Sequence, residues 1–155
     1  MRKSYNDLLN ECLPHISEVF PWDLAEEMQQ GNKPLLVDVR EPYEYDYLHI
    51  PESINVPRGV LETACEWDYD DTVPELARDR NVNVVLICRS GNRSAFAAFT
   101  LQQMGFTNVR SLKTGLRGWN DYDQPLVNGR DEAVDADDAD DYLSTKLRPE
   151  QMSPA

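Results

Sequence analysis

The stretch from Val84 to Ala98 constrains the fold of this chain more than any other. It opens with residues 84–87, a short uninterrupted apolar run that is typical of a strand buried on both faces. A cysteine, Cys88, follows, and after Arg93 the sequence has helical character up to Gly105. The residues available for the buried face of that helix are Phe96, Phe99, Leu101 and Met104. A strand, a tight loop and a helix in this order predict one unit of an α/β sheet.

The position of Cys88 between a strand and a helix favours a reactive thiol. Backbone N–H groups and the helix dipole stabilise negative charge at the first turn of a helix. Such surroundings promote the thiolate, which is the form of cysteine that acts as a nucleophile. The alternative is a buried, inert thiol. The pattern therefore makes Cys88 the candidate catalytic residue.

Strands and helices alternate along most of the chain. Strands are expected at residues 35–39, 53–56, 84–87 and 108–112, and helices at residues 1–13, 21–30, 41–47, 58–66, 74–78 and 116–122. This alternation predicts an α/β fold with a mostly parallel central sheet and helices on both faces. Ligands bind at the carboxyl ends of the strands in such sheets. Because Arg40, Cys88 and Lys113 each follow a strand, we expect them to share one rim and to form an anion site around Cys88.

Length and charge narrow the class of function. The 155 residues are enough for one domain with its own core. The formal net charge of −13 argues against nucleic acid as a partner, because phosphate binding needs clustered Lys and Arg. No apolar run approaches the roughly 18 residues of a membrane span, so we expect no membrane association. The N-terminus has no apolar region of the kind found in secretory signals.

The three cysteines are odd in number and widely spaced, which argues against a disulfide framework and fits a reducing, cytoplasmic location. Cys12 and His15 lie three positions apart, but no second pair accompanies them, so no metal site is expected. We expect no cofactor either. Cys12 and Cys65 are most simply packing residues, and the alternative for Cys65 is a role as a resolving thiol.

The chain divides into three parts by composition. Residues 1–15 are predicted to form a helical arm that packs on the domain, with a recognition helix as the alternative. Residues 16–128 carry the alternating strands and helices. Residues 129–155 are acidic, with few large apolar groups, and we expect this segment to be flexible, although Tyr142 and Leu143 could dock weakly.

Four sets of motifs resemble the rhodanese homology domain, a sulfurtransferase module, and they stand in the order found in that family. They are the first-strand signature at residues 36–45, the second at 49–57, the active-site loop at 88–94, and the closing segment at 104–109 and 115–119. The resemblance covers roughly residues 16–128 and implies a rhodanese-like fold. The chain departs from the family pattern at Leu48, Glu52 and Thr114, where glycine is usual. None of these departures touches the cysteine loop.

The resemblance implies that Cys88 carries a sulfane sulfur as a persulfide. The sulfur would come from thiosulfate or a persulfide donor and pass to a thiophilic acceptor, either cyanide or a protein or small thiol. The loop residues that would bind the donor are Arg89, Ser90, Gly91, Asn92, Arg93 and Ser94. Arg89 and Arg93 would hold the anionic donor, and which of the two faces the pocket stays open.

Residues outside the loop have two interpretations each. Asp38 and Arg40 form a structural ion pair, or Arg40 reaches the loop as a supporting residue. His49 fixes the turn at Ile50, or it takes part in acid–base chemistry. Trp119 is interpreted as a core residue rather than as part of the pocket.

Two other functions compete with sulfur transfer. A cysteine phosphatase or arsenate reductase is one, but related cysteine phosphatases have five residues between cysteine and arginine, whereas Cys88 and Arg93 enclose four. The smaller loop suits a sulfur atom on the cysteine, as the resemblance implies. The other alternative is a non-catalytic rhodanese-like module that binds proteins, in which the loop cysteine would be expected to be lost.

Overall fold

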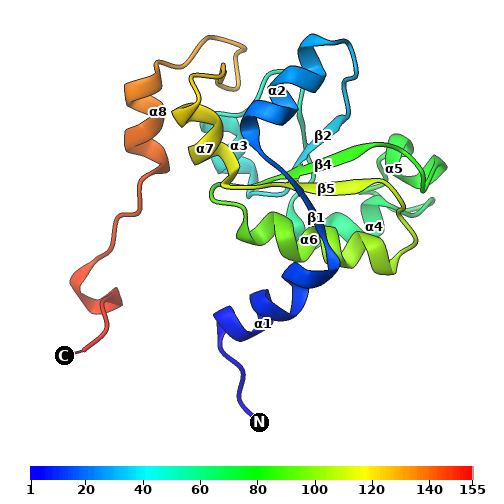
Figure 1. The fold of residues 1–155 in the computed structure, drawn as a ribbon, viewed down its shortest axis with the longest axis horizontal. Helices are drawn as coiled ribbons and strands as arrows, with labels where there is room; N and C mark the ends of the chain where they lie inside the picture. The colour runs from blue at the N-terminus through cyan, green and yellow to red at the C-terminus, as the bar shows by residue number, and fades with distance from the viewer. Residues whose placement is uncertain (155) are drawn as a thin grey trace.

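A computed structural model of the protein, which describes residues 1–154, contains one five-stranded sheet in which every pairing is parallel (Figure 1). The strands are β1 (Ser17–Val19), β2 (Leu35–Asp38), β3 (Ile54–Asn55), β4 (Val84–Ile87) and β5 (Val109–Leu112). Their order across the sheet is β1-β5-β4-β2-β3. β4, the strand that precedes Cys88, therefore lies at the centre, with neighbours on both sides.

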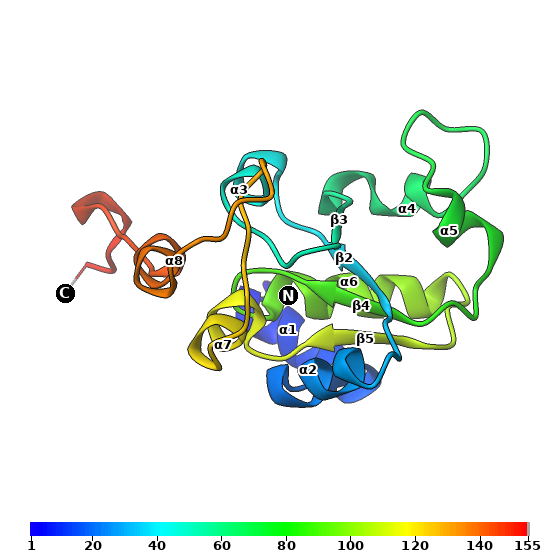
Figure 2. The ribbon, with the colours of Figure 1, turned by 90° about the horizontal axis from the view of Figure 1, so that it is seen from above.

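The helices connect the strands and cover both faces of the sheet, which confirms the predicted fold class (Figures 1 and 2). They are α1 (Tyr5–Cys12), α2 (Pro21–Gln29), α3 (Pro42–Tyr47), α4 (Leu61–Ala64), α5 (Pro74–Arg78), α6 (Asn92–Gln103), α7 (Gly115–Asp121) and α8 (Ala136–Leu143). Short 3-10 turns occupy Leu13–His15, Arg58–Val60 and Pro149–Gln151. In Figure 1 the sheet is seen close to edge-on, with α2 and α7 on one side and α4 and α6 on the other.

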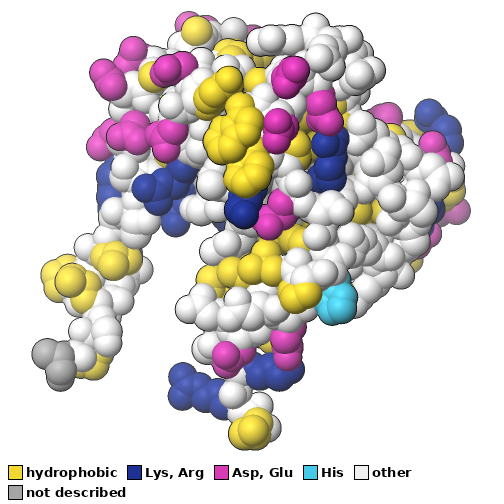
Figure 3. Space-filling model, in the orientation of Figure 1, with side chains coloured by type: hydrophobic (Ala, Val, Ile, Leu, Met, Phe, Trp, Pro, Cys, Tyr) yellow, Lys and Arg dark blue, Asp and Glu magenta, His cyan; other side chains and the backbone are white. Residues whose placement is uncertain are grey.

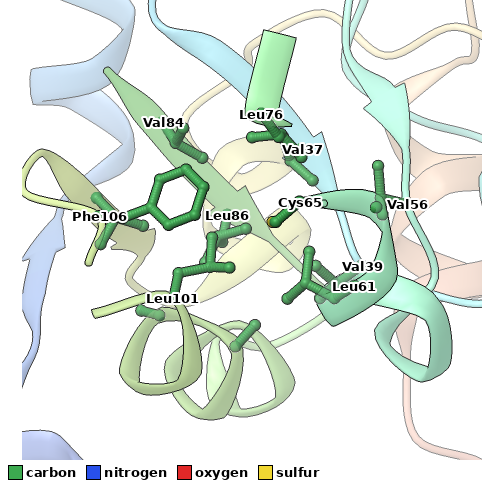
Figure 4. Packing of buried hydrophobic residues seen from close by; sticks show 14 of the residues in the cluster. Val37, Val39, Val56, Leu61, Cys65, Leu76, Val84, Leu86, Leu101 and Phe106 are labelled. Atoms are coloured by element: carbon green, nitrogen blue, oxygen red, sulfur yellow. The ribbon is translucent and has the colours of Figure 1, made fainter. Parts of the chain in front are cut away.

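Alternate residues of the strands supply two separate hydrophobic cores. On one face, Val37, Val84 and Leu86 pack with residues of α4, α5 and α6 (Figure 4). On the other face, Val85 and Ile87 pack with residues of α2, α7 and α8. All four residues of β4 are completely buried, as expected for a central strand that is covered on both faces.

α6 uses small residues, not aromatic ones, against the sheet. Ala95, Ala97 and Ala98 are buried, so the expectation that Phe96 and Phe99 form its buried face is wrong. The two rings turn outward and meet the N-terminal arm. Phe96 lies 5.8 Å from the ring of Tyr5, and Phe99 lies 5.6 Å from the ring of His15. The arm thus packs along the outer side of α6, and this contact brings α1 near the loop that precedes the helix.

Residues 136–143 are helical, whereas we expected residues 129–155 to be flexible, with at most a weak docking of Tyr142 and Leu143. Asp135 caps α8 by accepting from the backbone N–H groups of Asp137 and Asp138. Ala139 and Leu143 are buried against the core, and α8 packs against α7. The helix is acidic on its outer face only, so a narrow apolar stripe is enough to dock it. Figure 2 shows the chain after α8 extending away from the sheet.

The sequence analysis also missed β1, because a three-residue strand with two exposed side chains carries no periodic signal. Within residues 1–154, every helix is too short or too polar to span a membrane. The same residues contain no group of three or more His, Cys, Asp or Glu side chains placed to hold a metal ion.

Candidate active site

Cys88 directly follows the central strand, and its side chain is 1% exposed. Three residues separate it from α6, which begins at Asn92. The chain can turn this sharply because Gly91 has a φ of +97°, in the left-handed region that glycine adopts without strain. The tight turn places the first turn of α6 beside the sulfur atom.

The Cys88 sulfur lies in a ring of polar groups. The backbone N–H of Gly91 donates to Sγ over 3.1 Å, and that of Ser94 donates over 3.3 Å. The Ser94 hydroxyl lies 3.3 Å from Sγ and is in turn 2.7 Å from the hydroxyl of Ser111. Backbone N–H groups aimed at one atom stabilise negative charge on it. This arrangement suits a thiolate or a persulfide anion.

Ser111 is a site residue that the sequence analysis did not single out. It lies on β5, is completely buried, and shares its hydroxyl contact with Ser94. A serine within a buried strand is an unusual residue in a hydrocarbon core. This mismatch was the only signal in the sequence that could have revealed it.

α7 holds the cysteine loop in place by backbone hydrogen bonds. The N–H of Leu116 donates to the carbonyl of Cys88 over 2.9 Å, and the N–H of Arg117 donates to the carbonyl of Arg89 over 3.1 Å. A Cβ atom at Gly115 would come within 2.5 Å of the Cys88 carbonyl oxygen, so this contact requires glycine. The loop is thereby held at the fixed distance that its N–H groups need to reach the sulfur.

Arg93 pairs with a carboxylate on another element. Its two terminal nitrogens contact the two oxygens of Glu44, on α3, over 2.8 and 3.1 Å. Burial by itself would raise the pKa of Glu44, but the hydrogen bonds and the charge of Arg93 outweigh it and hold that pKa below its ordinary value. The pair therefore stays ionised. Glu44 is a second residue that the sequence analysis missed.

A hollow of about 250 Å³ opens beside the cysteine. Its lining residues are Tyr5, Cys88, Arg89, Ser90, Asn92 and Arg93. Arg89 forms no ion pair within residues 1–154, and its Nε atom is buried there without a hydrogen-bond partner. Tyr5 comes from the N-terminal arm and was not predicted at the site. Its ring is about half exposed.

Asp38 and Arg40 form a structural pair rather than part of the hollow. Both side chains are completely buried, and the Arg40 Nε and Nη2 atoms each lie 2.9 Å from an Asp38 oxygen. Nη2 also donates to the carbonyl of Leu48 over 2.6 Å. Of the two interpretations of Arg40, this geometry favours the ion pair over a reach to the loop.

His49 and Trp119 also have structural surroundings. The His49 ring stacks on Tyr45 with 3.8 Å between centroids, and its Nδ1 lies 2.7 Å from the Tyr45 carbonyl oxygen. Trp119 is 2% exposed, and its Nε1 donates to the carbonyl of Pro125 over 2.9 Å. Neither residue lines the hollow beside Cys88.

The other two cysteines, Cys12 and Cys65, are free and do not line the hollow beside Cys88. Cys65 is completely buried between the sheet and α4, near Leu86 and Val37 (Figure 4). Burial raises the pKa of its thiol to about 11. Burial also raises the pKa of Cys12. A high pKa suppresses the thiolate, so the geometry favours packing roles for both.

Comparison with known proteins agrees with this site. The family model of the rhodanese-like domain matches residues 21–122. A sulfurtransferase of Allochromatium vinosum is 30% identical over 112 residues, which cover 72% of this chain and 95% of the relative. The adenylyltransferase/sulfurtransferase MoeZ of Mycobacterium tuberculosis is 30% identical over 109 residues, or 70% of this chain. The chain spans only about a quarter (26%) of the length of MoeZ.

Solved structures give the same result. A Rhodopseudomonas palustris protein of unknown function, described as a possible tyrosine phosphatase, superposes with a TM-score of 0.72 at 29% identity, over 81% of this chain and 96% of its own. A thiosulfate sulfurtransferase of Pseudomonas aeruginosa shares the fold, with a TM-score of 0.63 at 24% identity over 86% of this chain and 25% of its own. Family and relatives support a role in sulfur transfer. By the family match and by its cysteine loop, this chain belongs to the rhodanese-like domain family.

Proposed function

We propose that this protein is a sulfurtransferase that carries a sulfane sulfur as a persulfide on Cys88. One observation carries the proposal: two backbone N–H groups, from Gly91 and Ser94, donate to the sulfur of a cysteine that borders an open hollow. A packing cysteine has no need of such donors. When a sulfur atom is added to Sγ, the negative charge resides on that outer sulfur, and the same donors lie beside it to stabilise the charge.

The first half of the reaction loads the sulfur. The Cys88 thiolate attacks the outer sulfur of thiosulfate, and a bond forms between Sγ and that sulfur. The sulfur–sulfur bond of thiosulfate breaks, and its electron pair leaves with sulfite. One negative charge resides on the cysteine before the step and on the persulfide after it, so charge balances. A low-molecular-mass or protein persulfide could donate by the same displacement.

The second half of the reaction transfers this sulfur from Cys88 to an acceptor. A thiolate acceptor, or cyanide in an assay, attacks the outer sulfur of the Cys88 persulfide. A new bond joins the acceptor to that sulfur, the bond to Sγ breaks, and the electron pair returns to Cys88 as a thiolate. No external oxidant or reductant enters. The cycle therefore needs no metal or redox cofactor.

The two arginines of the loop have different roles in this proposal. Within the described residues Arg89 has no carboxylate partner, and it lines the hollow, so it attracts the anionic donor. Arg93 also lines the hollow, but Glu44 engages both of its terminal nitrogens, so it braces the loop against α3. Arg89→Gln is expected to raise the KM for thiosulfate with little change in stability. Arg93→Gln is expected to lower stability as well, because it leaves the half-buried Glu44 carboxylate without its partner.

Intact mass after incubation with thiosulfate tests the function. The expected result is a gain of one sulfur atom that cyanide removes and that Cys88→Ser does not show. Cys65→Ser is the matched control and is expected to gain the sulfur. No gain in the wild type, or a gain that survives in Cys88→Ser, would overturn the proposal.

A phosphatase is the second candidate, because one structural relative is described as a possible tyrosine phosphatase. The loop has four residues between Cys88 and Arg93, and the arginine that would hold a phosphate is already paired with Glu44. Both facts favour sulfur over phosphate. We expect no hydrolysis of p-nitrophenyl phosphate under conditions in which the sulfur is gained. A non-catalytic binding module is disfavoured by the presence of Cys88 itself.

A further inference from the structure

A second hollow lies beside the cysteine loop, on the face formed by α2 and α7. It measures about 490 Å³, and its lining residues are Trp22, Ser90, Thr114, Arg117, Gly118, Asp121 and Tyr122. Ser90 also lines the hollow that contains Cys88. The two hollows therefore meet at one loop residue. Because the backbone of Arg117 is hydrogen-bonded to Arg89, the position of this groove relative to the cysteine is fixed.

One wall of the groove is aromatic and open to solvent. Trp22 and Tyr122 are each 48% exposed, and their ring centroids lie 6.1 Å apart. Phe20 also stacks on Trp22, with 4.7 Å between the ring centroids. Figure 3 shows exposed hydrophobic side chains gathered between α2 and α7, with both Lys or Arg and Asp or Glu side chains at their edge. Aromatic rings that stay exposed and stacked beside an active site offer a surface for a flat or apolar group.

The charges around the loop are unusual for this chain. Within residues 1–154, nine of the fifteen Lys and Arg side chains form ion pairs with carboxylates. Three of the remaining six surround the cysteine loop: Arg89, Lys113 and Arg117. Asp121 also borders the groove, and Glu18 borders the hollow beside Lys113, but within the described residues neither carboxylate forms an ion pair with these cations. Each unpaired cation can therefore attract an anion at short range. Arg89 faces the hollow of Cys88, while Arg117 faces the groove.

Thr114, which borders the groove, has a strained backbone conformation. Its φ is +67°, a left-handed conformation that is unfavourable for a β-branched residue. The threonine borders the groove and a third, smaller hollow on the side of Lys113. Strain of this kind persists where the surrounding structure requires it, and here it occurs at the edge of the groove.

We propose that this groove binds the sulfur acceptor, and that the acceptor is an organic thiol of low molecular mass with an aromatic or flat apolar group and a carboxylate. The inference rests on the proposed sulfur-transfer function and adds the class of acceptor. The apolar part lies against Trp22 and Tyr122, and the carboxylate pairs with Arg117. The thiol then reaches over Ser90 toward Cys88. After losing its proton to solvent, the thiolate attacks the outer persulfide sulfur and forms a bond to it. The bond of that sulfur to Sγ breaks, the Cys88 thiolate is regenerated, and the acceptor leaves as a persulfide.

The experiment compares four thiols that separate charge from aromaticity. They are 4-(mercaptomethyl)benzoate, benzyl mercaptan, 3-mercaptopropionate and 2-mercaptoethanol. Each protein is first loaded to completion with thiosulfate and freed of excess donor, so that only unloading is followed. The second-order rate constant for loss of the added sulfur is measured by intact mass. Each thiol is compared only with itself across variants, which removes differences in intrinsic nucleophilicity.

Two variants probe the groove, and two matched variants control for the loss of an exposed side chain. Arg117→Ala is matched by Arg78→Ala, another exposed arginine without an ion pair in the described chain, on α5. Trp22→Ala is matched by Trp67→Ala, because the two tryptophans are 48% and 50% exposed. All four positions are on the surface, so these variants are expected to fold.

Arg117→Ala is expected to slow unloading by the two carboxylate thiols about fivefold, with less than about twofold change for the neutral ones. Trp22→Ala is expected to slow the two aromatic thiols by a similar factor and to spare the aliphatic ones. The control variants should leave all four rates unchanged. Equal effects of groove and control variants, in proteins that all gain the sulfur, would overturn the inference alone. A wild type that gains no sulfur would overturn the proposed function first.

Discussion

Cys88 and Cys65 are almost equally buried, at 1% and 0% exposure, and belong to the same hydrophobic cluster, yet the groups that meet their sulfur atoms differ. The Cys88 sulfur accepts hydrogen bonds from two backbone N–H groups and lies on a hollow. Cys65 lies in a hydrocarbon core, where burial raises the pKa of its thiol to about 11. Burial alone therefore does not decide the reactivity of a thiol. What decides it is whether polar donors replace the water that burial removes.

Thiol labelling is the strongest test of the difference in reactivity between Cys88 and Cys65. At pH 8 a thiol with a pKa of about 11 is ionised in only about one molecule in a thousand. Iodoacetamide is therefore expected to label Cys88 in the native protein and to leave Cys65 unlabelled until the protein unfolds. Peptide mapping by mass spectrometry measures both sites. Equal labelling rates for the two cysteines would show that their surroundings do not control reactivity.

Stability at high pH tests the Cys65 side of the comparison. The pKa of Cys65 is raised by folding, from an ordinary value of 9.0 to about 11. The unfolded state therefore releases this proton first, and the stabilising effect present below pH 9 is lost as the pH rises toward 11. The wild type is expected to lose about 2 kcal/mol more than Cys65→Ala over this range. Urea unfolding at pH 8, 9.5 and 11 measures it, and parallel curves for the two proteins would contradict the assignment.

Ser94→Ala tests whether the hydroxyl beside the Cys88 sulfur contributes to its reactivity. The variant removes the hydroxyl beside Sγ and leaves the buried Ser111 hydroxyl without its partner, while the backbone N–H of residue 94 remains. We expect sulfur uptake from thiosulfate to slow about tenfold, with a destabilisation of about 1–3 kcal/mol. Ser111→Ala is the control, since it keeps Ser94 beside the sulfur. If Ser111→Ala slows uptake as much as Ser94→Ala does, the contact with sulfur is not the cause.

Tyr5→Ala is expected to have the smallest effect. The ring borders the hollow of Cys88 and does not belong to the hydrophobic cluster that contains Cys65. Its removal should widen the hollow and raise the labelling rate of Cys88 by about twofold, with no change at Cys65. Tyr43→Ala, which removes an exposed tyrosine outside this hollow, is the control. A change at Cys65 in the Tyr5 variant would indicate loosening of the whole domain.

The elements at the centre of the molecule could be predicted from the sequence alone. An uninterrupted apolar run, a cysteine and a helix predicted β4, the loop and α6, because these features depend on residues that are close in the chain. Alternation of strands and helices predicted the parallel sheet for the same reason. The pairing of Asp38 with Arg40, two positions apart, was within reach of the same reasoning, although an alternative stayed open.

Only the tertiary structure decided how the site is completed. Arg93 meets Glu44 across 49 positions, Ser94 meets Ser111 across 17, and Tyr5 reaches the loop from the N-terminal arm. The docking of α8 and the outward turn of Phe96 are of the same kind. Periodicity records which face of an element is apolar but not which element covers it. Partner choice depends on packing between distant segments, and it is this packing that turns a buried cysteine into a candidate sulfur carrier.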